Sequence, residues 1–347
     1  MSVLCPLTVA DLNTSINANT SLDLDSIFFN KGMDMQAKDI ENLRVEDDTW
    51  WREANREVSA DITFKLEERA KNGFAMQGFQ LSRLDLRNIY LVNNNAKSGF
   101  NFEDSDFYRS DLESAHCFKV DFSGCSLMKA NFKNANLHCA NLEDCNLLGA
   151  NFEQAKLEHV CWGDEILQEK MLKNASSPEE MDDLYQQTEE IYRHLRKVTE
   201  DQGLFDLSGQ FFRKEMIARR KQLPFFSGPR LLSKIVDLFC GYGEEPLRII
   251  AFTWFAIMMY AVVYLFAGLV YGEQIIQLDI AAGLDTNLYF FLDTLYFSII
   301  TFTTLGYGDI TPKGFSRFVA STEALMGSFS LALFVVVFVK KMIRSAQ

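Results

Sequence analysis

A five-residue period in the N-terminal half of the chain restricts its fold more strongly than any other feature. Large apolar residues recur at every fifth position from Phe102 to Leu157. The large set is Phe102, Phe107, Leu112, Cys117, Phe122, Leu127, Phe132, Leu137, Leu142, Leu147, Phe152 and Leu157, and small or apolar residues stand two positions earlier at Ala115, Val120, Cys125, Ala130, Ala135, Ala140, Cys145, Ala150 and Ala155. A helix repeats every 3.6 residues and a strand every two, so a period of five fits neither and indicates a repeat architecture.

Asn or Asp usually precedes the large residue, as in KANFKNANLHCANLEDCNLLGANFEQAKL. This pattern resembles the pentapeptide-repeat family. The resemblance implies a right-handed quadrilateral β-helix with four pentapeptides per coil, in which the large residues fill the interior. About fifteen pentapeptides would make roughly four coils. Leu81, Leu86 and Leu91 run one residue out of phase, and the polar stretch Asn93 to Ser98 is expected to absorb this slip.

Two apolar segments in the C-terminal part are each long enough to cross a membrane. Residues 249–269 carry no charge, and residues 318–339 carry only Glu323. At about 1.5 Å per residue, each helix would span a hydrocarbon core of about 30 Å. Basic residues precede the first span and follow the second, so the positive-inside tendency predicts a multi-pass protein of the inner cell membrane with both termini in the cytoplasm.

The motif TTLGYGD, Thr303 to Asp309, lies between these two spans. Stacked rings of backbone carbonyls can replace the water shell of a potassium ion. Such rings require conformations that L-residues disfavour, and that Gly306 and Gly308 adopt readily because they lack a Cβ. The apolar stretch Leu292 to Thr304 leads into the motif and is about three helical turns long. A second Gly-Tyr-Gly, at 241–243, has no threonine pair before it and is predicted to be a turn.

Two spans, a re-entrant helix and this motif resemble the two-transmembrane potassium channels of bacteria, over roughly residues 247–343. The resemblance implies a homotetramer in the lipid bilayer, with K⁺ ions in the filter and no other cofactor. The implied K⁺-coordinating residues are Thr304, Leu305, Gly306, Tyr307 and Gly308. Tyr307 is expected to point away from the pore axis and to support the filter strand from behind.

The same resemblance implies that Tyr296 supports the filter by a hydrogen bond to Asp309. Some relatives carry a glutamate four residues before the second threonine, where this chain has Ile300. Gating at the filter through that carboxylate is therefore not expected here.

Three residues of the second span are expected to take part in gating. Gly327 lies where inner helices of such channels often have a gating glycine, although a small residue for close helix packing explains it equally well. Val335 and Val339 are candidates for a hydrophobic constriction. Glu323 lies one turn before Gly327 and is predicted to hydrogen-bond a pore-helix hydroxyl, Ser298 or Thr301; an ion-attracting or pH-sensitive group is the alternative.

The remaining segments are expected to connect these modules. Residues 48–72 are predicted to form a helix that caps the first coil. The sequence Ser177-Pro178-Glu179-Glu180 is typical of a helix start, with the helix continuing to about Asp201 and a second following at 207–221. Residues 230–240 are amphipathic, which predicts a helix in the inner membrane interface, and a buried helix of the soluble part is the alternative.

The predicted fold is multidomain: a cytoplasmic pentapeptide-repeat β-helix and helical hairpin, followed by an all-α two-transmembrane potassium-channel pore. The expected divisions are an N-terminal region with a partly helical cap (1–73), the β-helix (74–162), the hairpin linker (163–222), an interfacial linker helix (223–245) and the pore domain (246–347). Within the pore domain they are a span (249–269), the pore helix (292–304), the filter (304–308) and a second span (318–339).

Composition removes several other classes of function. A net charge of −13 argues against nucleic-acid binding, and four histidines and seven cysteines show no metal-ligand spacing. No nucleophile, base and metal set can be assembled, so an enzyme is not predicted. The prediction is a potassium-selective channel whose cytoplasmic repeat domain regulates or assembles the pore. A membrane-anchored pentapeptide-repeat interaction scaffold is the alternative, but an anchor would not need TTLGYGD. The sequence identifies no cytoplasmic partner or ligand.

Overall fold

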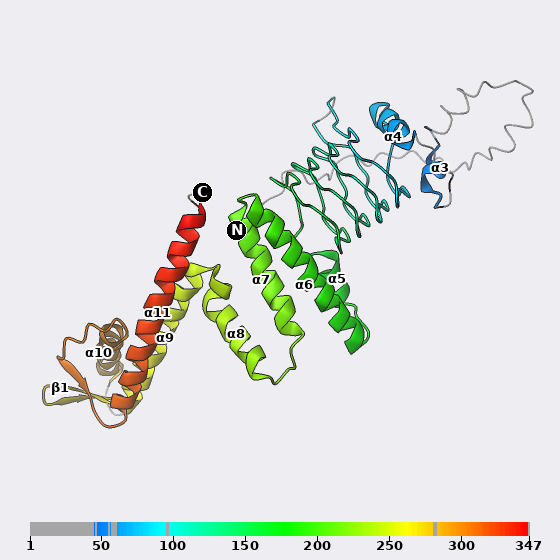
Figure 1. Cartoon of the computed structure of the whole chain (residues 1–347). Helices are drawn as coiled ribbons and strands as arrows, with labels where there is room; N and C mark the ends of the chain where they lie inside the picture. Colours follow the sequence, from blue (N-terminus) through cyan, green and yellow to red (C-terminus); the bar gives the residue numbers. More distant parts are fainter. Residues whose placement is uncertain are drawn as a thin grey trace, which may run out of the picture. The chain divides into compact units, whose positions relative to one another are not determined.

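The computed structural model describes residues 45, 47–54, 56, 61–94, 97–279 and 283–345. The expected N-terminal region, 1–73, therefore lies largely outside the described residues. The chain divides into two compact units, Met1–Val198 and Thr199–Gln347, which together hold the elements labelled in Figure 1.

The first unit contains a coil of short parallel bridges, drawn in Figure 1 as the thin repeated turns beside α4. Asn131 forms a parallel bridge with Asn151, and its side-chain amide donates to Asp111 Oδ1, 20 positions earlier, at 2.8 Å. A separation of 20 residues between neighbouring coils means that four pentapeptides complete one coil, as predicted.

The predicted slip in the repeat is visible as a longer first coil. The Phe79 backbone N–H donates to Ser105 Oγ at 2.9 Å across 26 positions, instead of 20. The additional residues fall in the stretch 93–98, of which residues 95 and 96 lie outside the described part.

The interior of the coil is filled as the period predicts. All of the large residues in the predicted set are at most 4% exposed, and the small ones at most 3%. Aromatic rings stack from one coil to the next: the centroids of Phe132 and Phe152 lie 5.4 Å apart with nearly parallel planes. Burying each phenylalanine contributes about 1.5–3 kcal/mol, so the stack is a main source of the coil's stability.

One corner of each pentapeptide has left-handed backbone. Lys129, Asn134, Cys139 and Gln154 all have φ of 59°, although none is a glycine. L-residues disfavour this region, because Cβ approaches the carbonyl oxygen. Backbone bonds to the next coil hold the corner: the Lys129 N–H donates to the Leu148 carbonyl at 2.9 Å. The sequence pattern does not mark this corner.

The single helix predicted over residues 48–72 is wrong, because two helices form instead: α3, Asp48–Arg52, and α4, Ile62–Lys71. The break follows from the position of Trp51, which is fully buried. Its indole stacks on the Phe79 ring at 5.3 Å between centroids, and its carbonyl accepts from the Gln80 N–H at 2.9 Å. The free energy gained by burying a tryptophan against the end of the coil exceeds the small gain in helix propensity that a continuous helix would bring.

The coil is followed by α5, Leu167–Leu172, and α6, Pro178–Asp201. Helix α6 begins as its sequence predicts, since Ser177 Oγ accepts from the Glu180 N–H at 3.1 Å. The boundary between the two compact units falls within the last turn of α6.

Two side chains from these helices pair with polar groups of the coil. Gln168 donates to Asn146 Oδ1 at 2.9 Å. His194 Nε2 accepts from the Phe152 backbone N–H at 3.3 Å. Phe152 lies in the last coil, so no carbonyl of a following coil accepts from this N–H. Burial lowers the pKa of His194, which keeps the ring in the neutral form that can accept.

The second unit begins with α7, Phe205–Lys221, and α8, Gly228–Cys240. The amphipathic pattern of α8 leaves its apolar side chains exposed at Leu231, Leu232, Ile235 and Leu238, by 52% to 67%. Within one chain α8 is therefore not buried, and its placement in the membrane interface stays a prediction. The Gly-Tyr-Gly at 241–243 forms the short turn η1, as predicted, with positive φ at all three residues.

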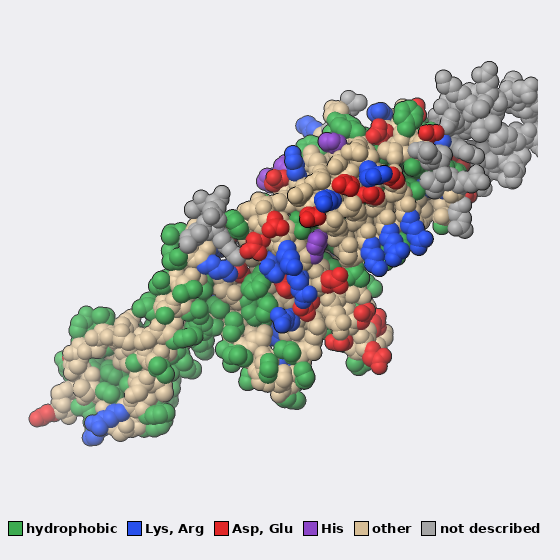
Figure 2. All heavy atoms as spheres, in the orientation of Figure 1, with side chains coloured by type: hydrophobic (Ala, Val, Ile, Leu, Met, Phe, Trp, Pro, Cys, Tyr) green, Lys and Arg blue, Asp and Glu red, His purple; other side chains and the backbone are tan. Residues whose placement is uncertain are grey.

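Three longer helices complete the second unit: α9, Pro246–Ala267; α10, Leu284–Phe302; and α11, Ser316–Ser345. Helices α9 and α11 are long and apolar enough to cross a membrane. Figure 2 shows hydrophobic side chains over this part of the molecule and few charged ones. Helix α10 begins at Leu284, well before the start predicted at residue 292.

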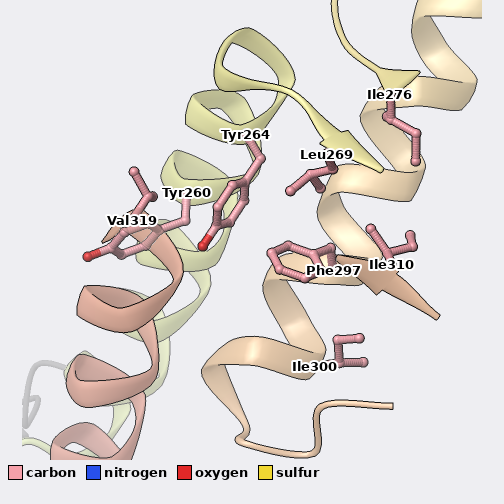
Figure 3. Packing of buried hydrophobic residues seen from close by; sticks show 8 residues of the cluster. All are labelled: Tyr260, Tyr264, Leu269, Ile276, Phe297, Ile300, Ile310 and Val319. Atoms are coloured by element: carbon pink, nitrogen blue, oxygen red, sulfur yellow. The ribbon is translucent and has the colours of Figure 1, made fainter. Parts of the chain in front are cut away.

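A small antiparallel sheet makes the expectation of an all-α pore incomplete. Strands β1, Leu269–Tyr271, β2, Gln274–Ile276, and β3, Ile310–Pro312, are arranged in the order β2-β1-β3. Three-residue strands are too short to produce a readable alternation in the sequence. Each strand contributes an apolar side chain to the buried cluster of Figure 3. In this cluster the rings of Tyr264 and Phe297 meet edge to face, with centroids 5.0 Å apart.

Candidate ion-conducting site

The end of α10 holds the first residues of the TTLGYGD segment by backbone hydrogen bonds. The Thr303 N–H donates to the Ile299 carbonyl at 3.0 Å. The Leu305 and Gly306 N–H groups both donate to the Ile300 carbonyl, at 2.9 and 3.2 Å. These bonds fix the start of the segment to the last turn of α10, so a displacement of α10 moves the segment with it.

The sign of φ alternates along the segment. Thr304, Gly306 and Gly308 have φ of 57°, 52° and 81°, whereas Leu305 and Tyr307 are not in the positive region. Backbone in which the sign of φ alternates can turn successive carbonyl groups towards the same side, which is the arrangement that a coordinating ring needs.

Thr304 is a strained residue that the sequence does not predict, since the motif indicates unusual conformations for its glycines alone. A β-branched residue at positive φ is a genuine outlier and costs on the order of 1–3 kcal/mol. Its hydroxyl lies 2.7 Å from the carbonyl oxygen of Thr303. Such strain at an exposed site is typical of a segment whose conformation serves a function.

Within one chain, the segment is exposed. Leu305 is 61% and Tyr307 69% exposed, and a Cβ built on Gly306 or Gly308 meets no atom within 4 Å. The requirement for glycine is therefore conformational within one chain. The expected support of the strand by Tyr307 from behind would have to involve another subunit.

The residues expected to support the filter lie together. Tyr296 Oη donates to Asp309 Oδ2 at 3.0 Å. Ile300 is 4% exposed and belongs to the apolar cluster of Figure 3. A carboxylate at Ile300 would therefore be surrounded by apolar side chains.

Gly327 packs directly on the end of α10. A Cβ at this position would lie 1.9 Å from the Phe302 carbonyl oxygen, which no side chain can occupy. The close-packing explanation for Gly327 is thus correct, and the hinge role stays a prediction. Val335 and Val339, on the same helix, are 52% and 39% exposed in the single chain.

Glu323 is fully buried, at 0% exposure. Of the two hydroxyls predicted as partners, Ser298 on α10 contacts Glu323 Oε1. Tyr264 Oη on α9 donates to Glu323 Oε2 at 2.6 Å, a partner that the sequence analysis missed. Since Tyr264 is 59 positions away, no local spacing signals this contact.

The C-terminal end of α11 contacts the segments that precede α9. Lys340 Nζ lies 2.7 Å from Glu244 Oε1, and it lies 5.7 Å from the centroid of the Phe212 ring on α7. Gly209 on α7 makes room for this carboxylate, because a Cβ there would lie 2.4 Å from Glu244 Oε2.

A second charged cluster surrounds Asp237 on α8. Its carboxylate lies 2.9 Å from Arg220 Nη1 and 3.4 Å from Arg213 Nε, both on α7. The Tyr242 hydroxyl of η1 lies 3.0 Å from Arg220 Nη1. The predicted turn at 241–243 therefore also fastens α8 to α7.

Comparison with known proteins identifies two families. A family model for ion channels matches residues 252–344, and one for pentapeptide repeats matches residues 125–161 in eight copies. Protein LctB of Geobacillus stearothermophilus is 30% identical over 112 residues, which make up 30% of this chain and 84% of that protein. Two-pore potassium channel 4 of Arabidopsis thaliana is 57% identical over 35 residues, 10% of this chain and 12% of that protein.

The C-terminal part of the chain is thus a potassium-channel-like domain with two candidate membrane spans. The chain belongs to the ion channel family and carries pentapeptide repeats in its N-terminal part. Both families are of non-enzymatic kinds.

Solved structures similar to this chain include two pentapeptide repeat proteins. Rfr23 from the cyanobacterium Cyanothece 51142 is 21% identical, with 27% of this chain and 86% of that chain covered and a TM-score of 0.18. HetL from Nostoc sp. strain PCC 7120 is 24% identical, with 24% and 48% covered and a TM-score of 0.16. Because these TM-scores are low, the fold of the coil rests on its bridges, its interior and the family model.

Proposed function

We propose that this chain forms a potassium-selective homotetrameric channel in the cell membrane, with a cytoplasmic pentapeptide-repeat domain that regulates or assembles the pore. The observation that carries the proposal is the alternating φ of Thr304 to Gly308, directly after a helix and between two apolar helices. Backbone carbonyls on one side of this segment would supply the oxygen rings that replace the water shell of K⁺.

A single chain leaves surfaces exposed that a tetramer would cover. Non-helical backbone at membrane depth is tolerated only where it lines a cavity or is buried in protein. The filter segment and apolar residues of α11, such as Leu325 at 75% and Leu331 at 63%, are exposed in one chain. Four copies around an axis would enclose the filter and leave the outer face of α9 to the lipid. Tyr296 and Asp309 would then brace each filter strand.

The topology and division of the chain follow from the same proposal. The pore domain comprises residues 246–347 and the β-helix residues 74–162, with both termini in the cytoplasm. Residues 163–222 form the helical link. Helix α8, within the interfacial segment 223–245, would lie on the inner membrane surface with its exposed leucines in the lipid.

The test is a reversal potential measured on the purified protein in liposomes, with K⁺ on one side and Na⁺ on the other. A strongly K⁺-selective potential is expected, and Gly306→Ala should abolish conduction or selectivity because φ of 52° suits an alanine poorly. Gly314→Ala, also at positive φ but outside the filter, is the matched control for general strain. A reversal potential near zero would contradict potassium selectivity, and absence of any flux would favour the membrane-anchored scaffold.

The role of the cytoplasmic part is tested by a shortened chain starting at Pro224. This removes α7 and with it the contacts of Phe212 and Gly209 to Lys340 and Glu244. We expect retained selectivity with altered open probability or weaker tetramers. Unchanged gating and assembly would mean that the β-helix serves another protein, and lost selectivity in assembled tetramers would mean that the modules are not independent.

A further inference from the structure

Glu323 lies between three helices without a charged partner. Its side chain is fully buried among α9, α10 and α11, in the first third of α11. None of the salt bridges among the described residues involves it. A buried carboxylate without a cation is very unfavourable, and more so at membrane depth, so a neutral form with satisfied hydrogen bonds is the stable alternative.

The hydrogen bonds around Glu323 determine where its proton lies. Ser298 Oγ lies 2.9 Å from the Ile257 carbonyl, and also within hydrogen-bond distance of Glu323 Oε1. A serine hydroxyl has one hydrogen, and a carbonyl oxygen has none. If Ser298 donates to Ile257, the contact with Glu323 is a hydrogen bond only if the carboxyl group donates it.

The third contact agrees with this assignment. Tyr264 Oη donates to Glu323 Oε2 at 2.6 Å, so Oε2 is an acceptor. One arrangement therefore satisfies every contact: Tyr264 donates to Oε2, Oε1 donates to Ser298, and Ser298 donates to the Ile257 carbonyl. With an ionised Glu323, one of the two Ser298 contacts would lack a hydrogen.

We propose that Glu323 is a protonated, neutral carboxylic acid that acts as a positioning residue for the filter. It links α9 through Tyr264 and α10 through Ser298 to its own helix, α11. This inference rests on the proposed potassium-selective function for its effect on conduction, although the location of the proton does not depend on that function.

The link from Glu323 to the filter is short. Ser298 lies two residues before Ile300, whose carbonyl accepts the N–H groups of Leu305 and Gly306. Gly327 lies one turn after Glu323 on α11. It packs on the carbonyl of Phe302, the last residue of α10. Residues of α11 thus hold α10 at two successive turns, immediately behind the strained segment, and a shift of α11 is transmitted to the filter carbonyls.

The full burial of Glu323 also disfavours the role of an ion-attracting group. A carboxyl group that concentrates cations must face water, whereas both oxygens of Glu323 are occupied by partners on α9 and α10.

The proton is tested by infrared difference spectroscopy on the full-length protein at neutral pH. The spectrum of the native protein minus that of Glu323→Gln should contain the C=O stretching band of a protonated carboxylic acid. Glu273→Gln, at an exposed residue of the turn between β1 and β2, is the matched control and should give carboxylate bands only. Carboxylate bands in the Glu323→Gln difference would overturn the assignment.

The positioning role is tested by the ratio of K⁺ to Na⁺ permeability in assembled tetramers. The side-chain amide introduced by Glu323→Gln can donate to Ser298 and accept from Tyr264, so this variant should keep the ratio within about threefold of native. Glu323→Leu retains bulk but neither of the two hydrogen bonds, and should lower the ratio by at least about tenfold, the factor that matches loss of one buried hydrogen bond. A native ratio in Glu323→Leu, or equal losses in both variants, would overturn the positioning role.

Two further variants apply if Glu323→Leu does not assemble. Tyr264→Phe and Ser298→Ala each remove one partner while keeping the shape of the site, and each should lower the ratio severalfold. Native ratios in both would overturn the role. The failure of the proposed function looks different, because the native protein itself would then show no preference for K⁺ while the infrared band remained.

Discussion

The coil and the filter use the same unusual backbone, and they differ in what stabilises it. In the coil, left-handed residues recur every five positions, as at Lys129 and Asn134. In the filter they recur every two, at Thr304, Gly306 and Gly308. Corners such as Lys129, Asn134 and Cys139 bond to the next coil of the same chain, as the Lys129 N–H does to the Leu148 carbonyl. The filter residues, by contrast, are exposed, and space surrounds both glycines.

Within one chain, the coil has the contacts that offset its strained backbone, and the filter lacks them. The coil balances its strained corners with hydrogen bonds and buried apolar side chains from the same chain. The filter has strain of a similar kind and few contacts to offset it, apart from those at the end of α10. Strain persists only where the surroundings over-determine it, so the exposed segment fits the proposed tetramer, in which other subunits would surround it. Changes in the coil should therefore affect local stability, and changes at the pore should affect assembly and conduction.

The largest effect is expected at Gly327. A Cβ there would lie 1.9 Å from the Phe302 carbonyl oxygen, so Gly327→Ala must separate α11 from the end of α10. Overpacking of this kind costs about 1–3 kcal/mol in each subunit. Rubidium flux per tetramer should fall at least about tenfold, while the circular dichroism of the coil stays unchanged. Ser328→Ala, at the exposed neighbouring position, is the control. Native flux in Gly327→Ala would show that the close packing is not needed.

A substitution inside the coil should lower its stability and leave potassium selectivity unchanged. Phe122 is fully buried and stacks with Phe102 at 5.9 Å between centroids. Phe122→Ala should destabilise the coil by about 3–5 kcal/mol, measured by chemical denaturation of the full-length protein. Phe118→Ala, on a partly exposed ring beside His138, should cost much less. Potassium selectivity should be native in both variants, and a loss of selectivity in Phe122→Ala would break the separation between the two regions.

A smaller, pH-dependent effect is expected where α6 meets the coil. Burial lowers the pKa of His194, and the positive charge of Lys197 acts in the same direction. As pH falls, the unfolded chain therefore binds the proton first, at its ordinary value of about 6.5. Stability from this contact is complete above that value and is lost as pH falls through it towards the lowered value of the folded state.

Denaturation of the coil between about pH 7.5 and pH 5.5 measures this effect, expected to be about 1 kcal/mol. His194→Gln keeps an acceptor for the Phe152 N–H but does not titrate, so its stability should depend less on pH than that of the native protein. Identical pH dependence in the two proteins would show that His194 does not couple to folding.

The parts of the molecule that could be predicted from sequence are those governed by repetition or by a local motif. The coil interior follows from a period that fixes every fifth side chain, and the positive φ of Gly306 and Gly308 follows from the seven residues of TTLGYGD. Ser298 could be proposed as a partner of Glu323 because the pore helix and the second span flank the same motif. In each case the signal lies within a short stretch of sequence.

The missed features depend on distant pairs or on conformations without a composition signal. Tyr264 and Glu323 are 59 positions apart, and Lys340 and Glu244 are 96 apart. The break between α3 and α4 depends on one tryptophan that finds a ring on the coil. The left-handed conformation of Thr304 opposes the preference of its own side chain, so only the folded surroundings can specify it.

The smallest expected effect concerns the contact that joins α11 to the segment before the first span. Lys340 and Glu244 are partly buried, and such a pair is worth no more than about 1 kcal/mol. If α11 moves in gating, Lys340→Gln should change open probability by about two- to fivefold, because the pair stabilises one position of the helix end. Selectivity should stay native, since the filter lies at the other end of α11.

The charge exchange Glu244→Lys with Lys340→Glu should restore part of the native open probability, whereas Lys341→Gln, at the next residue, serves as the control for loss of a positive charge. If the exchange behaves as the sum of its two single changes, the pair does not couple, and the packing of Val337 against Cys240 and Ile249 remains as a contact through which the segment before α9 can act on α11.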